Sequence, residues 1–132
     1  MNKNIIAFIL AFNFTNICVV NAQDISSDML TDLAIPLMEG LVEQTEEAVL
    51  FDSPEGRIIN AQAFGSVNGA DVYQYYLMVL PSLGWGIIGQ NNILCADGID
   101  FCLEATREVE KIILNIENKN NTSKVTYSLS PN

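Results

Sequence analysis

The chain has 132 residues, with 16 acidic and 6 basic side chains, no histidine and a formal net charge of −10 at pH 7. Proteins bind nucleic acids and anionic lipids through clusters of lysine and arginine, and this sequence contains no such cluster. We therefore exclude both classes of partner. The length corresponds to one domain that can bury a core of its own.

Residues 1–22 are predicted to be a signal peptide. Lys3 gives a short positive start, residues 5–12 are an unbroken apolar run, and Ala22 supplies the small residue that favours cleavage before Gln23. The apolar run is shorter than the roughly 20 residues that span a bilayer, so we expect no stable membrane insertion after cleavage. The expected location is periplasmic or secreted.

Residues 23–47 are predicted to form an N-terminal arm, first helical and then irregular. Apolar residues recur at helical spacing, at Leu30, Leu33, Leu37 and Leu41. Pro36 disfavours helical geometry at the residue before it, so the helix should run from residue 27 to about residue 34. Two interpretations remain open. Either the arm packs on the body of the domain, or Leu37, Met38 and Leu41 form an exposed apolar patch that binds a partner.

Residues 48–132 are predicted to fold as a single α+β domain. Two extended runs flank the turn at residues 53–56, where a proline and a glycine favour a chain reversal, so a hairpin is expected. In the second run apolar and polar residues alternate, with Ile59, Ala61 and Ala63 on one face. That period of two predicts a strand with one polar face.

An amphipathic helix follows this hairpin. Asn68 and Asp71 have the spacing of a capping box, and one apolar stripe follows, at Val72, Tyr76, Val79, Leu80 and Leu83. Pro81 and Gly84 predict the end of the helix, and Trp85 the start of a strand. Ser82, in this turn, has no histidine anywhere in the chain to act as its base, so no catalytic residue is predicted here.

Three more alternating runs lie near residues 103–106, 112–117 and 125–129, separated by polar reversals. The complete order is then β-β-α-β-β-β-β after the helical arm. This order predicts a single antiparallel sheet with one helix packed on one face.

Three short strings carry a resemblance: "FDSPEGRI" at 51–58, "LPSLGW" at 80–85 and "VTYSLSP" at 125–131. They resemble, in the same order, a family of small, exported, functionally uncharacterised proteins of Gram-negative bacteria. The resemblance implies export and brings no site residues or activity with it. The connection "GQNNILCADGIDFC" at 89–102 is longer than in that pattern, so a function placed there would be particular to this chain.

No cofactor and no metal site are predicted. Without histidine, the cysteines cannot supply the usual ligands of zinc. Oxygen-bearing side chains between residues 91 and 104 fit no calcium-loop spacing and are expected to form a solvated acidic loop. After signal cleavage Cys95 and Cys102 are the only thiols, and an exported compartment is oxidising, so they are predicted to form a disulfide.

These observations predict an exported, non-enzymatic accessory domain of the cell envelope, either structural or binding another envelope protein. The alternative is a small-ligand binder or a carboxylate-based hydrolase with a site near Trp85. The sequence does not indicate an oligomeric state.

Overall fold

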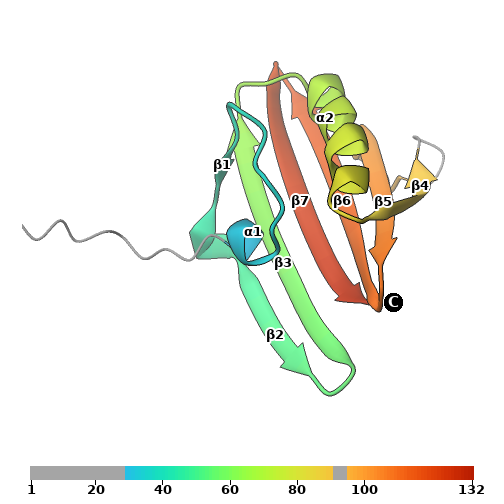
Figure 1. Ribbon diagram of the computed structural model, residues 1–132. Coiled ribbons are helices and arrows are strands. Elements are labelled where there is room, and N and C mark those ends of the chain that lie inside the picture. The colour runs from blue at the N-terminus through green and yellow to red at the C-terminus, as the bar shows by residue number, and fades with distance from the viewer. Residues whose placement is uncertain (1–28, 91–94) are drawn as a thin grey trace, which may run out of the picture.

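A computed structural model describes residues 29–90 and 95–132 (Figure 1). It contains one open antiparallel sheet of 7 strands with a helix packed against it, which confirms the predicted α+β class. In chain order the elements are α1 (Met29–Asp32), β1 (Val42–Glu43), the 3-10 helix η1 (Thr45–Glu47), β2 (Val49–Ser53), β3 (Gly56–Gly65), α2 (Gly69–Ser82), β4 (Gly86–Gln90), β5 (Phe101–Arg107), β6 (Glu110–Lys119) and β7 (Thr122–Pro131).

The strands lie in the order β1-β3-β7-β6-β5-β4, and β2 also pairs with β3. Strands β1 and β2 therefore share one edge of β3: β1 pairs with residues 63–64 and β2 with residues 56–60. Beyond Ile59, towards the turn, β3 pairs with β2 alone among the described strands, because its pairing with β7 begins at Ile59. The hairpin of β2 and β3 consequently projects past the rest of the sheet (Figure 1).

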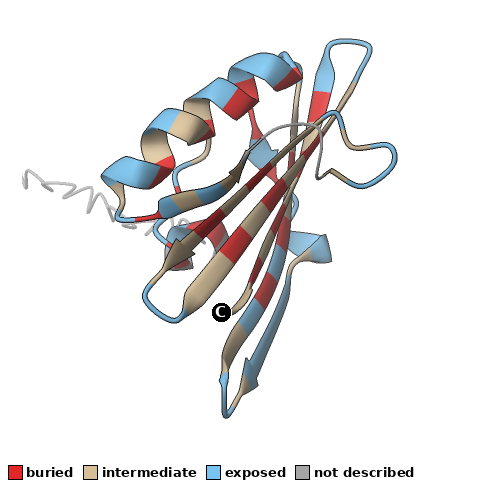
Figure 2. Cartoon of the chain, turned by 90° about the vertical axis from the view of Figure 1, so that its right-hand side faces the viewer, coloured by how far each residue is buried: buried red, intermediate tan, exposed pale blue. Residues whose placement is uncertain are grey.

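The core lies between the sheet and the two helices. One face of α2, including Val72, Tyr76 and Leu80, is buried against the sheet, and alternate residues of β6 and β7 meet it from below (Figure 2). The arm that contains α1 lies on the same side and joins the same core, where Leu30 and Leu33 are buried together with the small Ala61 and Ala63 of β3.

Helix α2 begins and ends where the sequence predicts. The Asn68 side chain caps its first turn, although Oδ1 accepts from the backbone N–H of Ala70, at 2.8 Å, rather than from that of Asp71. At the other end Gly84 adopts a φ of 87°, which a side chain would strain, and the Trp85 N–H donates to the Leu80 carbonyl at 3.0 Å. This turn delivers the indole of Trp85 into the core.

The N-terminal arm is more ordered than the sequence indicates. Its helix is the single turn α1, and the part expected before Met29 lies outside the described residues. The segment expected to be irregular contains β1, which pairs Glu43 with Ala63 at the edge of the sheet. Two residues are too few to show alternation, so this strand arises from tertiary pairing and not from a local pattern.

Candidate functional site

Strand β2 carries large apolar side chains at the surface. Val49 is 56% exposed, Leu50 50% and Phe51 59%, and Ile58 opposite them on β3 is 37% exposed. Figure 2 shows this hairpin mostly in the colour of exposed residues. Eight large hydrophobic side chains are exposed in the described part of the chain, and with Val42 five of them lie at this one edge. Exposed apolar side chains gathered at one edge in this way are typical of interaction sites.

The strand pairing divides these side chains between the two faces of the sheet. Leu50 pairs with the buried Ile59, so it lies on the face that carries the helices. Phe51 pairs with Ile58, and Val49 lies two residues before it, so these three share the opposite, uncovered face. The strand therefore presents exposed apolar side chains on both faces of the sheet.

The backbone of β2 is also available for pairing. In the described residues β2 pairs only with β3, so alternate N–H and C=O groups along it point away from the sheet. The opposite edge of the sheet differs. Strand β4 contains a register shift between Ile87 and Gly89, and such bulges discourage a further strand from pairing. Of the two edges, β2 is the one with a regular five-residue strand.

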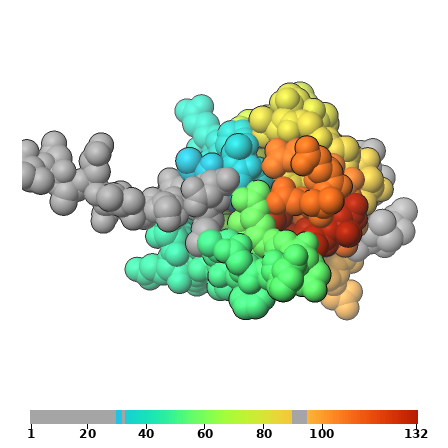
Figure 3. All heavy atoms as spheres, turned by 60° about the horizontal axis from the view of Figure 1, so that its bottom comes forward, coloured from blue at the N-terminus to red at the C-terminus, as the bar shows by residue number. Residues whose placement is uncertain are grey.

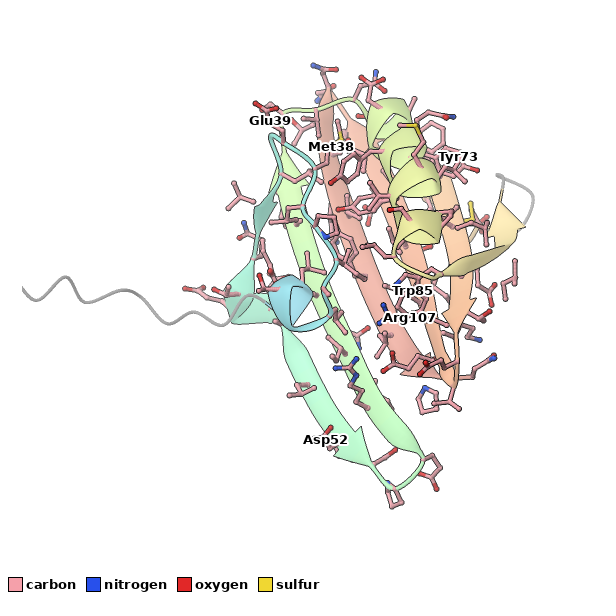
Figure 4. The ribbon with its side chains drawn as sticks, in the orientation of Figure 1. Met38, Glu39, Asp52, Tyr73, Trp85 and Arg107 are labelled. Atoms are coloured by element: carbon pink, nitrogen blue, oxygen red, sulfur yellow. A yellow bond between two sulfur atoms is a disulfide. The ribbon has the colours of Figure 1, made fainter. Side chains whose placement is uncertain are left out.

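Carboxylates stand at both ends of this apolar strand. Glu46 and Glu47 of η1 precede it, and Asp52 and Glu55 follow the apolar residues; all four are exposed. Figure 4 labels Asp52 on the hairpin, and Figure 3, which brings the lower end of the molecule forward, shows the hairpin as part of the outer surface. The site is thus an apolar centre with acidic ends. We call Val49, Leu50, Phe51 and Ile58 the edge patch.

An ion pair joins the turn end of β3 to β6, two strands away in the sheet. Arg57 Nε donates to Glu110 Oε1 at 2.7 Å, and Arg107 contacts the other oxygen of Glu110 at 3.7 Å. The hydrogen bond from Arg57 lowers the pKa of Glu110, despite its partial burial. The projecting hairpin is therefore held in place by a charge-assisted contact that spans β7.

Trp85, the centre of the alternative prediction, is buried in the core. Its indole is 1% exposed, and the Arg107 guanidinium lies 4.3 Å from the ring centroid (Figure 4). The carboxylate that contacts Arg107 is Glu110, whose pKa is lowered. A lowered pKa does not suit a general acid, which has to be protonated at neutral pH, and the alternative function near Trp85 stays a prediction.

The sequence also singled out Leu37, Met38 and Leu41. Leu41 is 7% exposed, and Leu37 and Met38 are half-buried against the core. The three are packed as the first interpretation of the arm expected, so they are not the exposed patch of the second. A partner-binding role for them stays a prediction.

Cys95 and Cys102 form the predicted disulfide, with their Cα atoms 5.5 Å apart. The turn between them closes through the Ile99 N–H and the Ala96 carbonyl, at 3.1 Å. This wider loop allows the bridge, as a two-residue turn at 97–98 would not. The disulfide joins the loop to the first residues of β5.

A buried hydroxyl network lies under the arm. Tyr76 donates to the Pro36 carbonyl at 3.1 Å, and the Tyr76 and Tyr127 hydroxyl oxygens lie 2.7 Å apart. A hydroxyl has a single hydrogen, so Tyr127 is the donor in that second bond. Burial raises the pKa of Tyr76 to about 12 and also raises that of Tyr127. The Glu43 carboxylate accepts from the Leu30 N–H at 3.3 and 3.4 Å, which joins α1 to β1 within the arm.

A shallow hollow of about 370 Å³ lies at the far end of the uncovered face, lined by Phe64, Glu117, Lys119, Asn120, Thr122 and Lys124. Within it Lys124 forms an ion pair with Glu117 at 3.5 Å. The hollow is at the turn between β6 and β7, distant in the sequence and the sheet from Trp85, so it does not supply the site that the alternative prediction placed there.

In residues 29–90 and 95–132, no three or more histidine, cysteine, aspartate or glutamate side chains are grouped so that they could hold a metal ion. None of the helices in those same ranges is long and apolar enough to cross a membrane. Comparisons of the chain with protein-family models, with curated proteins and with solved structures found no match.

The sequence did not single out the edge patch. Residues 48–51 are a run of consecutive apolar residues without alternation, next to a strand that alternates clearly. This lack of alternation was the available signal for the edge patch. A strand with consecutive apolar residues carries apolar side chains on both faces, whether or not other elements cover them.

Proposed function

We propose that this chain is an exported, non-enzymatic accessory domain of the cell envelope that binds another protein through the edge patch. The observation that carries the proposal is the exposure of Val49, Leu50 and Phe51 on a strand whose outer edge has no described neighbour. Edge strands with exposed apolar side chains are used for recognition by addition of a further strand.

Export is supported by two features. The sequence begins with the pattern of a signal peptide, and the Cys95–Cys102 disulfide is the kind of bond that persists in oxidising compartments. Mass spectrometry of the native protein from a periplasmic or secreted fraction should give a chain that starts at Gln23. A chain that retains Met1 would show that the N-terminus is not a cleaved signal.

Binding is tested by chemical crosslinking in intact envelopes, followed by identification of the crosslinked protein. Phe51→Glu should abolish the crosslinked product, because it puts a charge in the centre of the edge patch. Met78→Glu is the matched control, since Met78 is 70% exposed on α2, away from this edge, and should leave the product unchanged. Thermal melting should show both variants folded, as surface substitutions typically change stability by about 0.5 kcal/mol or less. The same product with Phe51→Glu as with Met78→Glu would contradict the proposal.

A further inference from the structure

We infer that the partner of the edge patch is an extended segment with alternating apolar residues and with lysine or arginine at both of its ends, which pairs with β2 as an additional strand. The inference rests on the proposed function and specifies the chemistry of the partner. It combines the strand edge without a described neighbour, the two-sided apolar surface and the acidic ends.

The geometry of β2 favours an extended occupant. The outward N–H and C=O groups of an edge strand repeat along the strand, and only another extended backbone matches that repeat. A strand placed beside β2 would set alternate side chains next to Val49 and Phe51 on one face and the remaining ones next to Leu50 on the other. An alternating segment thus meets the two-residue side of the patch with its apolar set. A helix or a small molecule could cover one face of the patch but would leave the backbone edge unpaired.

The charges at the two ends select a basic segment. Glu46 and Glu47 lie on one side of the apolar centre, and Asp52 and Glu55 lie on the other, all exposed. The basic residue of this hairpin, Arg57, is hydrogen-bonded to Glu110 across the sheet. Opposite charges placed across neighbouring strands stabilise pairing, and like charges oppose it. A partner with positive side chains at both ends therefore complements β2.

The same charges disfavour a second copy of this chain. An antiparallel pair of β2 strands centred on Leu50 would bring Glu46 and Glu47 of one copy beside Asp52 and Glu55 of the other, at both ends. Centring the pair on Phe51 would set Glu47 directly opposite Glu55. Either register concentrates carboxylates at each end of the interface, on a chain whose net charge is already −10.

The test uses a synthetic peptide, Lys-Lys-Thr-Val-Thr-Ile-Thr-Lys-Lys, titrated into the full mature protein with its disulfide intact. Binding is followed by NMR shifts of the β2 amides and by fluorescence of a dye on the peptide. Replacing the peptide lysines with glutamates should weaken binding at least about 10-fold at low salt, and the difference should narrow as salt screens the charges. Equal binding of the two peptides would overturn the inferred charge pattern.

Two further peptides test strand pairing itself. Backbone amides of an extended chain point alternately to its two edges, so N-methylation of one alternate set blocks one edge only. One methylated peptide should lose binding, and the other should bind as the parent does. If both bind like the parent, the occupant is not an added strand and the inference is wrong. Phe51→Glu should also abolish binding of the parent peptide, and Met78→Glu should not.

These results separate the inference from the function on which it rests. If Phe51→Glu abolishes envelope crosslinking but none of the peptides binds, the edge patch binds a protein of another chemistry, and only the inference fails. If sedimentation shows that the mature protein dimerises and Phe51→Glu makes it monomeric, the occupant is a second copy, which also overturns the inference. If Phe51→Glu leaves crosslinking unchanged, the proposed function itself fails.

Discussion

Arg57 and Glu110 join the projecting hairpin to β6, across the intervening β7, through a 2.7 Å hydrogen bond between Nε and Oε1. The two residues are 53 positions apart in the chain. Strand β7 lies between their strands, and Glu110 itself pairs with Pro131 at the end of β7. The contact therefore fixes the part of β3 that extends beyond its pairing with β7.

Arg57→Met should lower the free energy of unfolding at neutral pH by about 1 kcal/mol or less, because both side chains are partly exposed to solvent. The loss should depend on pH. The folded-state pKa of Glu110 is below the ordinary value of 4.5, so its stabilising contribution is present above pH 4.5 and disappears as the pH falls through the lowered value. Urea unfolding of the variant and the wild type across this range measures the effect.

Lys124→Met is the control for that experiment. Lys124 and Glu117 form a longer contact of 3.5 Å, and Glu117 is more exposed than Glu110, so the substitution should cost little at any pH. Equal losses for Lys124→Met and Arg57→Met, or a loss at Arg57 that persists in acid, would show that the hydrogen bond does not brace the hairpin.

Tyr76→Phe should destabilise the protein more than Tyr127→Phe. The first change removes the donor to Pro36 and leaves the buried Tyr127 hydroxyl without its acceptor, a loss of about 1–3 kcal/mol. The second leaves the bond from Tyr76 to Pro36 in place, so it should cost about 1 kcal/mol. Urea unfolding of both single variants and of the double variant gives their coupling. The reverse order of the single losses would refute the assigned donor directions.

Alkaline pH should weaken the fold through these same tyrosines. The pKa of Tyr76 rises from 10.0 to about 12 on burial, so its contribution is complete below pH 10 and is lost as the pH rises towards 12. Unfolding free energies measured between these pH values should therefore fall. The decline should be shallower when both tyrosines are replaced by phenylalanine, and an equally steep decline would assign the effect to other groups.

Leu41→Ser should cost about 2–4 kcal/mol, because Leu41 is buried in the core. The neighbouring Val42 is 64% exposed, so Val42→Ser should change stability by about 0.5 kcal/mol or less. Thermal melting of the two variants compares a buried and an exposed position of the same arm. A wild-type melting temperature for Leu41→Ser, with loss of partner binding, would restore the interpretation of this arm as an exposed patch.

Replacing Cys95 and Cys102 together by alanine should lower the free energy of unfolding by about 2–3 kcal/mol, the value expected for a short closed loop. The wild type under reducing conditions should match the double variant. Alkylation of the unreduced native protein should label neither of these two cysteines and should label both after reduction. Labelling before reduction would show that the bond is absent from the native protein.

Much of the fold follows from local pattern. The stripe of α2 and the alternation in β3, β6 and β7 are long enough to specify period and face, and Gly84 specifies where the helix ends. The disulfide followed from the count of thiols and the expected compartment. Each of these predictions depends on neighbouring residues or on composition, and none requires knowing where distant segments lie.

The edge patch and β1 could not be found in the same way. A run such as residues 48–51 indicates a strand but does not show whether another element covers it, because coverage depends on where distant segments lie. The arm illustrates the same limit. Leu41 and Val42 are adjacent and both apolar, yet one is buried and the other exposed, and only pairing with β3 decides which.

The carboxylates around the edge patch also bear on how the protein behaves at high concentration. Exposed apolar strands tend to stack edge to edge, and charged residues beside them act as gatekeepers against aggregation. Here Glu46, Glu47, Asp52 and Glu55 hold that position. High salt would screen their mutual repulsion, so purification and storage at low salt should keep the protein dispersed.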